Sequence, residues 1–197
     1  MKCVCTFAII MIVLVVMLSV VAAAEDGRIS LFNGKDMEGW TILKCKATVD
    51  NGQILIQDGN GLIQSEKKYK DFILEFEWKA LAEDNWDSGV YFRYTDVPKG
   101  KPWPPRYQVN LRKGMEGNVE GVEGASSEGL IKAGEWNTFK LTVKGDALDL
   151  QINGKQAWTA KGLEELGSGF IALQAEVPNG GQHRFRNIYI TELKEAE

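Results

Sequence analysis

Two stretches of alternating hydrophobic and polar residues stand near the middle of the chain, at residues 71–80 and 88–94. Successive side chains of a β-strand point to opposite faces, so each stretch predicts a strand with one apolar face. In the first stretch this face is formed by Phe72, Leu74, Phe76 and Trp78. In the second stretch it is formed by Val90, Phe92 and Tyr94. Because only a short polar link separates the two stretches, we expect them to be antiparallel neighbours in a sheet.

Short alternating runs separated by turn residues continue on both sides of this pair. Asn51-Gly52, Gly145-Asp146 and Asn153-Gly154 lie between such runs, and these dipeptides are strong signals for β-hairpins. We interpret Asp58-Gly59-Asn60-Gly61 as a further turn between two strands. Helical character is confined to Leu163–Leu166, which is one turn at most. Many short strands with almost no helical periodicity predict an all-β fold, an antiparallel β-sandwich.

The first residues have a different character from the rest. Residues 6–24 contain no charged side chain and end in three alanines before Glu25. This pattern is typical of a secretory signal peptide, so we expect residues 1–24 to be cleaved and residues 25–197 to form one secreted or periplasmic domain. The alternative is an uncleaved anchor, since roughly 20 apolar residues can span a bilayer. Only in that case would the membrane be a partner.

Composition and charge limit the classes of molecule that residues 25–197 are expected to bind. Removal of residues 1–24 leaves 22 basic and 27 acidic residues, a net charge of −5. The basic residues are not clustered, which argues against nucleic acid as a partner. Cys45 would be the single cysteine left, so no internal disulfide is expected, and a domain of this size does not need one.

A set of polar side chains falls on the non-core side of several predicted strands. It comprises Glu75, Glu77, Tyr91, Arg93, Gln108, Asn110, Gln174 and Glu176. If these strands are neighbours in a concave sheet, then acids, amides and an arginine converge on one groove. Sugar hydroxyls favour such planar, bidentate partners, so carbohydrate is the expected ligand. The solvated side of an ordinary sheet would give the same pattern, and that alternative stays open.

Seven short motifs occur in order along the chain, and they carry a family resemblance. They are Leu31-Phe-Asn-Gly-Lys-Asp with Trp40, Asp71-Phe72, Ser88-Gly-Val-Tyr-Phe-Arg93, Trp136-Asn137, Ile152-Asn-Gly-Lys155, Ile171-Ala-Leu-Gln174 and Phe185-Arg-Asn-Ile188. Together they resemble the 3-keto-disaccharide hydrolase domain family over essentially the whole of residues 25–197. The resemblance implies an exported jelly-roll sandwich of the concanavalin or laminin-G type that acts on 3-keto glycosides.

The chain departs from this family pattern in three places. The family usually has Tyr-Glu-Val-Gln where this chain has Tyr107-Gln108-Val109-Asn110, so an amide replaces a glutamate. The family's histidine and glycine after Gln174 are replaced by Ala175-Glu176-Val177, and Gly121–Gly124 stands in place of Gly-Ala-Ile-Tyr. If the missing acid and histidine are the catalytic groups, this member binds sugar without turnover.

Two chemical routes are open to the carboxylates. Glu75 and Glu77 have Cα atoms about 6.6 Å apart on one strand face, and an ordinary glycosidase needs carboxyl groups roughly 5–5.5 Å or 6.5–9.5 Å apart. A 3-keto sugar offers elimination instead, because its ketone acidifies the neighbouring C2 hydrogen and one base can remove it. Glu77 or Glu176 is then the candidate base, and Arg93 the cation beside the developing enolate. The predicted substrate-binding set comprises Glu75, Tyr91, Gln108, Asn110, Gln174, Trp86 and Trp103.

The remaining candidates have mainly structural interpretations. His183, the only histidine, falls on the core side of the last predicted strand, which favours packing. One histidine without a cysteine cluster argues against zinc. We expect no cofactor, although loop carboxylates leave a calcium or magnesium ion open. Trp86 and Trp103 lie in predicted loops, where they either stack on sugar rings or fold onto the core.

These observations favour an exported protein that hydrolyses or eliminates the glycosidic bond of 3-keto glycosides. A non-catalytic carbohydrate-binding module on the same scaffold is the alternative, favoured by the altered positions Gln108 and Glu176. A third possibility, an adhesion sandwich, would require a large exposed apolar patch, which the sequence does not indicate.

Overall fold

The computed structural model describes residues 27–194, which form eleven β-strands and no helix. The strands are β1 (Arg28–Ser30), β2 (Trp40–Asp50), β3 (Gln53–Ser65), β4 (Phe72–Ala80), β5 (Gly89–Tyr94), β6 (Gln108–Asn110), β7 (Asn137–Lys144), β8 (Ala147–Ile152), β9 (Lys155–Lys161), β10 (Phe170–Val177) and β11 (His183–Glu192). The all-β prediction is confirmed, and the helical turn expected at Leu163–Leu166 does not form. The predicted signal peptide, residues 1–24, lies outside the described residues.

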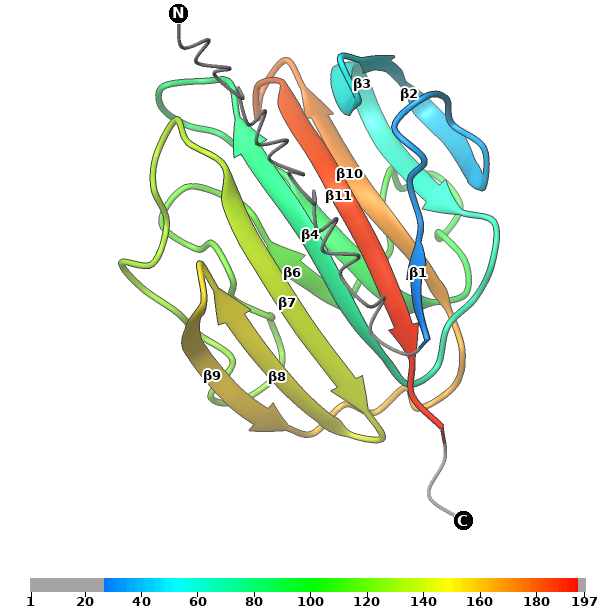
Figure 1. The fold of residues 1–197 in the computed structure, drawn as a ribbon, viewed down its shortest axis with the longest axis vertical. Helices are drawn as coiled ribbons and strands as arrows, with labels where there is room; N and C mark the ends of the chain where they lie inside the picture. The colour runs from blue at the N-terminus through cyan, green and yellow to red at the C-terminus, as the bar shows by residue number, and fades with distance from the viewer. Residues whose placement is uncertain (1–26, 195–197) are drawn as a thin grey trace, which may run out of the picture.

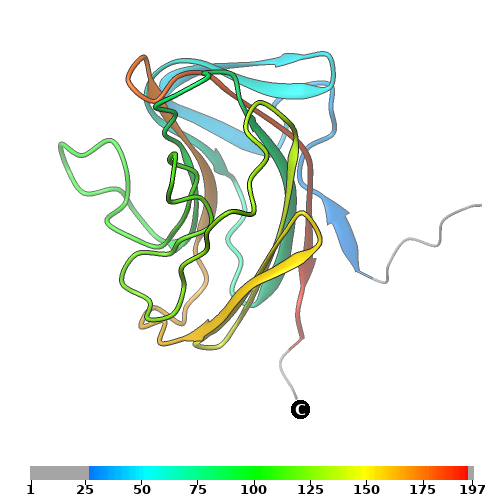
Figure 2. The same ribbon diagram turned by 90° about the vertical axis from the view of Figure 1, so that its left-hand side faces the viewer.

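The strands form one antiparallel sheet that curls over on itself. Hydrogen bonds link them in the order β6-β5-β10-β3-β11-β4-β7-β8-β9, with β1 added on β11 and β2 on β3. Strands β11, β4, β7, β8 and β9 form a front layer that faces the viewer in Figure 1. Strands β5, β6 and β10 form a rear layer, and Figure 2 shows the two layers edge-on. The outer surfaces of these layers are called the front face and the rear face below.

Strand β3 joins the two layers. Its residues 54–56 pair with β11, whereas its residues 59–64 pair with β10. A strand that changes sheets needs a bend, and here the register against β2 shifts twice and Gly59 has φ +93°. The turn predicted at Asp58–Gly61 is therefore wrong, because the strand continues through these residues. Gly61 instead allows the β2 backbone to lie close to β3, since a Cβ atom at Gly61 would lie 1.9 Å from the carbonyl oxygen of Leu43.

Two of the predicted hairpins show the expected turn chemistry. Asn51 and Gly52 connect β2 to β3 with φ of 51° and 75°, and Asn153 and Gly154 connect β8 to β9 with φ of 53° and 74°. Two successive residues with positive φ match the right-handed twist of the flanking strands, and asparagine followed by glycine tolerates this conformation best. The predicted β7–β8 hairpin at Gly145-Asp146 is also present.

The hydrophobic core lies between the two layers. From the front layer, Phe76 stacks on Phe139 with 4.9 Å between ring centroids, and Trp78 meets Phe139 edge-on. From the rear layer, Val90 and Phe92 are fully buried in the same core. The alternation read from the sequence is thus confirmed for β4 and for the first part of β5, and it fixes which side chains point outward.

The expectation that β4 and β5 are neighbours is wrong. Strand β4 pairs with β11 and β7, while β5 pairs with β10 and β6. Residues 81–88 instead cross from the front layer to the rear layer, because eight residues easily span the roughly 10 Å between packed sheets. This crossing segment is held against the β10–β11 connection by hydrogen bonds from the Leu81 amide to Gln182 and from the Asp87 amide to Gly180, both 2.9 Å.

Candidate functional site

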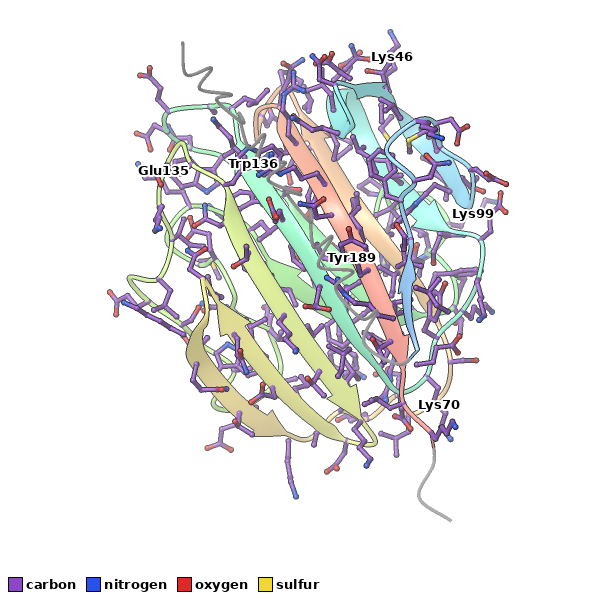
Figure 3. All side chains as sticks on the ribbon, viewed as in Figure 1. Lys46, Lys70, Lys99, Glu135, Trp136 and Tyr189 are labelled. Atoms are coloured by element: carbon purple, nitrogen blue, oxygen red, sulfur yellow. The ribbon has the colours of Figure 1, made fainter. Side chains whose placement is uncertain are left out.

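The predicted groove does not exist as one surface, because its residues lie on opposite faces. Glu75 and Glu77 point outward from β4 on the front face, where Tyr189 (labelled in Figure 3) also lies. Glu75 accepts a 2.9 Å hydrogen bond from Arg28, and Glu77 accepts bonds of 2.6 Å from Arg186 and 2.7 Å from Asn187. Gln108, Gln174, Glu176 and Tyr91 point outward from the rear layer instead. The shared-groove prediction is therefore wrong for Glu75 and Glu77, whose carboxylates serve ion pairs on the front face.

Arg93 belongs to neither face. Its φ of 52° turns the end of β5, so that its side chain is fully buried at the rim between the layers. The guanidinium donates to Asp71 Oδ1 at 2.6 Å, to the Lys70 carbonyl at 2.6 Å and to the Gly145 carbonyl at 2.5 Å. Asp71 Oδ1 also accepts from the Gly145 amide at 2.8 Å. The predicted placement of Arg93 in the groove is wrong. Its three hydrogen bonds instead join β5 to the β3–β4 connection and to the β7–β8 turn.

The rear face carries a chain of polar side chains across three strands. Gln108 on β6 donates through Nε2 to Oε1 of Gln174 on β10, and Gln174 Nε2 donates to Glu176 Oε2 at 3.0 Å. Strand β5 lies between β6 and β10, and the Gln108 side chain passes over it at Gly89. Gly89 leaves room for this close approach, and Ser88 Oγ donates a 2.8 Å hydrogen bond to the main-chain carbonyl of Gln174.

The open end of this chain is a pocket of about 360 Å³ beside Glu176. Its lining includes Asp87 from the crossing segment and Arg112, which follows β6. Arg112 Nε lies 3.7 Å from Asp87 Oδ2. Burial raises the pKa of Glu176 above its usual range, and the nearby Asp87 carboxylate raises it further, while Arg112 opposes the rise. The pKa of Asp87 is raised by burial as well. A carboxylate with a raised pKa beside a cation is a suitable general base.

Apolar and aromatic groups line the rest of the rear face. Tyr91, Tyr94, Leu62 and Ala172 form a small buried cluster outside the main core, and Trp103 packs against it. Trp103 Nε1 lies 3.2 Å from both the Gly61 and the Ala175 carbonyl oxygens, which fixes its loop on the rear face. That loop stands beyond the rear layer in Figure 2. Tyr94 was expected on the core side, but the turn at Arg93 brings it next to Tyr91, 6.3 Å between ring centroids.

The other predicted site residues have structural contacts. Trp86 is buried, and its indole donates to Glu116 at 2.9 Å, so it packs onto the core rather than standing free. Asn110 lies on the rear face at the sheet edge, where its Oδ1 accepts from the Arg112 amide at 2.7 Å. The structural interpretation of His183 is confirmed, because the ring is fully buried and accepts at Nδ1 from Trp78 Nε1 at 3.1 Å. Its Nε2 faces the carbonyl oxygens of Asp87 and Gly180 at 3.0 and 2.9 Å.

Sequence reasoning missed Asp87 and Arg112. Asp87 lies in a connection, where the alternation of faces gives no information about where it points. Arg112 continues the alternation of Gln108 and Asn110, which predicts that it lies on the polar side but does not show that it borders a site. The signal that was present is their position: Asp87 immediately precedes Ser88-Gly89, and Arg112 immediately follows the last apolar residue of the Gln108–Leu111 run. Ends of strands that pair with each other lie close together, so residues flanking Gly89 and Asn110 share one rim.

Residues 27–194 lack both a metal-binding cluster and a membrane-spanning helix. No group of three histidine, cysteine, aspartate or glutamate side chains gathers there in a way that could hold a metal ion. Within the same range, no helix is long and apolar enough to cross a bilayer.

Comparison with known proteins agrees with the fold and the order of motifs. The sequence profile of the 3-keto-alpha-glucoside-1,2-lyase-like domain matches residues 27–191. The 3-keto-disaccharide hydrolase of Bacteroides thetaiotaomicron is 31% identical over 156 residues, which cover 60% of this chain and 53% of that protein. The chain therefore spans about half the length of this curated relative.

Solved structures share the architecture at low sequence identity. A Parabacteroides distasonis protein assigned provisionally to the glycosyl hydrolases has a TM-score of 0.67 at 23% identity, covering 85% of this chain and 94% of that chain. The carbohydrate-binding module CBM66 of Bacillus subtilis has a TM-score of 0.62 at 16% identity, covering 78% and 96%. These likenesses confirm the predicted jelly-roll sandwich. Because the profile match extends over nearly all of the described residues, the chain belongs to the 3-keto-alpha-glucoside-1,2-lyase-like domain family.

Proposed function

We propose that this protein cleaves the glycosidic bond of 3-keto glycosides on its rear face, with Glu176 as the base. The family description and the name of the Bacteroides thetaiotaomicron relative support the substrate class. The observation that carries the proposal is the hydrogen bond from Gln174 to Glu176 at a pocket where Glu176 has a raised pKa. A base tuned toward the working pH is what proton abstraction beside a ketone requires.

The proposed reaction is an elimination followed by addition of water. Glu176 takes the C2 proton, the electron pair of the C2–H bond forms the C1–C2 double bond, and the C1–oxygen bond breaks. The departing oxygen takes a proton from Asp87 or water and leaves as an alcohol. Water then adds across the double bond and yields the 3-keto monosaccharide. Arg112 replaces Arg93 as the cation that stabilises negative charge developing on the C3 oxygen.

Aromatic groups supply the binding surface for the sugar. Trp103 is partly exposed on the same face as Glu176, and aromatic rings pack well against the apolar faces of sugar rings. Tyr91 is 6% exposed and supports this surface from the buried cluster. Gln108 and Gln174 are engaged with each other and with Glu176, so we assign them to holding the base rather than to direct sugar contacts. Glu75 and Glu77 have no part in this scheme.

Incubation of the purified protein with a 3-keto disaccharide and, in parallel, with the unoxidised disaccharide tests the proposal. We expect release of the 3-keto monosaccharide from the first substrate only, because the unoxidised sugar has no acidic C2 hydrogen. In deuterated water, elimination and readdition should place deuterium at C2 of the product, and mass spectrometry detects this label. Cleavage of the unoxidised disaccharide at an equal rate would refute the mechanism.

A carbohydrate-binding function without turnover is the second candidate. It is favoured by the likeness to CBM66 and by the openness of the pocket, where the Arg112 side chain is 61% exposed. Calorimetric binding of the 3-keto disaccharide with no product after prolonged incubation would establish this function instead.

We further propose that the protein is exported. Support comes from the apolar run and small-residue end of residues 1–24. Amino-terminal sequencing of the protein from its native host would give Glu25 as the first residue, whereas an intact Met1 would contradict cleavage.

A further inference from the structure

The Gln108 side chain reaches its partner across an intervening strand. Gln108 pairs with Tyr91 in the β5–β6 ladder, whereas its partner Gln174 belongs to β10 on the far side of β5. The path is open only because residue 89 is glycine. A Cβ atom on Gly89 would lie 1.8 Å from Gln108 Nε2 and 2.4 Å from Gln108 Cδ. The lack of a side chain at position 89 therefore provides the space through which the amide passes.

The chemistry of the three side chains fixes the direction of the hydrogen bonds. Gln174 is 4% exposed, and its amide has Gln108 at one end and Glu176 at the other. An ionised carboxylate only accepts hydrogen bonds, so Gln174 must turn its NH₂ group toward Glu176. Its oxygen then faces Gln108 and needs a donor there. Glutamine supplies that donor, whereas an ionised glutamate at position 108 would not.

We propose that Gln108 is a positioning residue, which acts through Gln174 to hold the Glu176 carboxylate as a hydrogen-bond acceptor facing the pocket. The inference rests on the proposed function only in giving Glu176 the role of base. It explains why an amide is compatible with turnover at this position. A neutral donor at position 108 keeps the negative charge on Glu176, whereas an acid there would compete for the same Gln174 amide.

Other titratable groups lie near Glu176, and their influence must be separated from this effect. Asp87 reaches it from the crossing segment, Arg112 and Lys113 from the segment after β6, and Tyr91 from β5. None of these side chains is changed by a substitution at position 108. A change in the titration of Glu176 in Gln108 variants therefore reports on the amide chain, provided that added charge by itself is controlled.

The test is titration of the Glu176 side-chain carboxyl by carbon-13 NMR in the wild type, Gln108→Glu and Gln108→Asn. Gln108→Asn keeps an amide but is too short to cross β5, so it removes the donor without adding charge. Gln151→Glu, which adds one charge on the front face, is the control. We expect the Glu176 midpoint to rise by about one pH unit in Gln108→Glu and by a smaller amount in Gln108→Asn. The midpoint should not move in Gln151→Glu.

Each outcome decides the proposal. An unchanged midpoint in both Gln108 variants overturns it, and a rise in Gln108→Glu alone overturns it too, because charge alone would then account for the shift. Nitrogen–proton spectra show whether each variant is folded. If Gln108→Glu does not fold, the midpoint of Glu176 in Gln108→Asn decides the proposal. Shifts of the expected size in a protein that releases no sugar would refute the proposed function and leave the positioning role intact. Turnover without these shifts would support cleavage of 3-keto glycosides and refute the positioning role of Gln108.

Discussion

Gln174 and Glu176 stand two residues apart on β10, and the amide of the first donates to the carboxylate of the second across 3.0 Å. Residues two apart on a strand share a face, so this contact lies along one strand and does not require the neighbouring strands to be known. The candidate site is organised around this pair. Gln108 and the Gly89 crossing support it from one side, and Asp87 and Arg112 bound the pocket on the other.

Gly89→Ala should separate the stability of the fold from the integrity of the site. The new methyl group would occupy the space of the Gln108 amide, but that amide is the end of a flexible side chain and can swing away. We expect the free energy of unfolding to change by about 1 kcal/mol or less. The value of kcat for 3-keto disaccharide cleavage should fall by roughly tenfold, because loss of the Gln108 hydrogen bond leaves Gln174, and through it the Glu176 base, less precisely positioned. Urea denaturation and steady-state kinetics measure the two quantities.

Gly167→Ala is the matched control for that experiment. A Cβ atom at Gly167 would meet nothing within 4 Å, so neither stability nor kcat should change. If Gly89→Ala kept full activity, the passage of Gln108 over β5 would have no functional role.

The ion pair of Arg93 and Asp71 should be essential for stability and not for chemistry. The Arg93 side chain is fully buried and Asp71 is 12% exposed, so removal of one partner leaves a buried charge without compensation. Arg93→Met should lower the free energy of unfolding by about 3–5 kcal/mol. Where the variant remains folded, kcat should stay near the wild-type value, because the guanidinium does not reach the rear face.

Lys46→Met provides the comparison for Arg93→Met. Lys46 lies 3.7 Å from Asp58, with both side chains more than half exposed, and exposed pairs contribute about 0–1 kcal/mol. Equal losses of stability in the two variants, measured by urea denaturation, would contradict the structural role of Arg93.

His183 should make stability depend on pH below neutrality. Burial lowers the pKa of His183 to about 4, whereas an exposed histidine in the unfolded chain has a pKa near 6.5. Between these values the unfolded chain binds a proton that the folded protein does not. The free energy of unfolding should therefore fall as the pH falls from 6.5 to 4, by up to roughly 3 kcal/mol from this residue. In His183→Gln the same series of urea titrations should show a shallower decline, and an identical pH dependence would exclude His183 as the cause.

The fold could be predicted from the sequence because its main features are local. Alternation along β4, the Asn-Gly turns and the lack of helical periodicity all report on neighbouring residues, and the structure follows them. The pairing of strands is not local. Residues 81–88 could close a hairpin or cross between layers, and which occurs depends on how β4 finds β11 and β7.

The candidate site was predicted in part for the same reason. Gln108, Gln174, Glu176 and Tyr91 share the rear face as their alternation indicated. The errors at Glu75, Glu77 and Arg93 have two physical causes. Alternation shows that a side chain points away from the core but not to which of two outer surfaces, and the positive φ of Arg93 breaks the alternation within β5. Asp87 lies in a connection, where alternation gives no direction, and the alternation that predicts Arg112 on the polar side does not show that it borders the pocket.

Steady-state cleavage of a 3-keto disaccharide by Glu176→Gln, beside Glu77→Gln, tests the central claim most directly. If Glu176 is the base, its amide variant should retain substrate binding and lose kcat by about 10²–10⁴-fold, the usual contribution of general base catalysis. Glu77→Gln, an equivalent change on the front face, should cleave at the wild-type rate. Full activity in Glu176→Gln, or an equal loss in Glu77→Gln, would contradict the assignment of the active face.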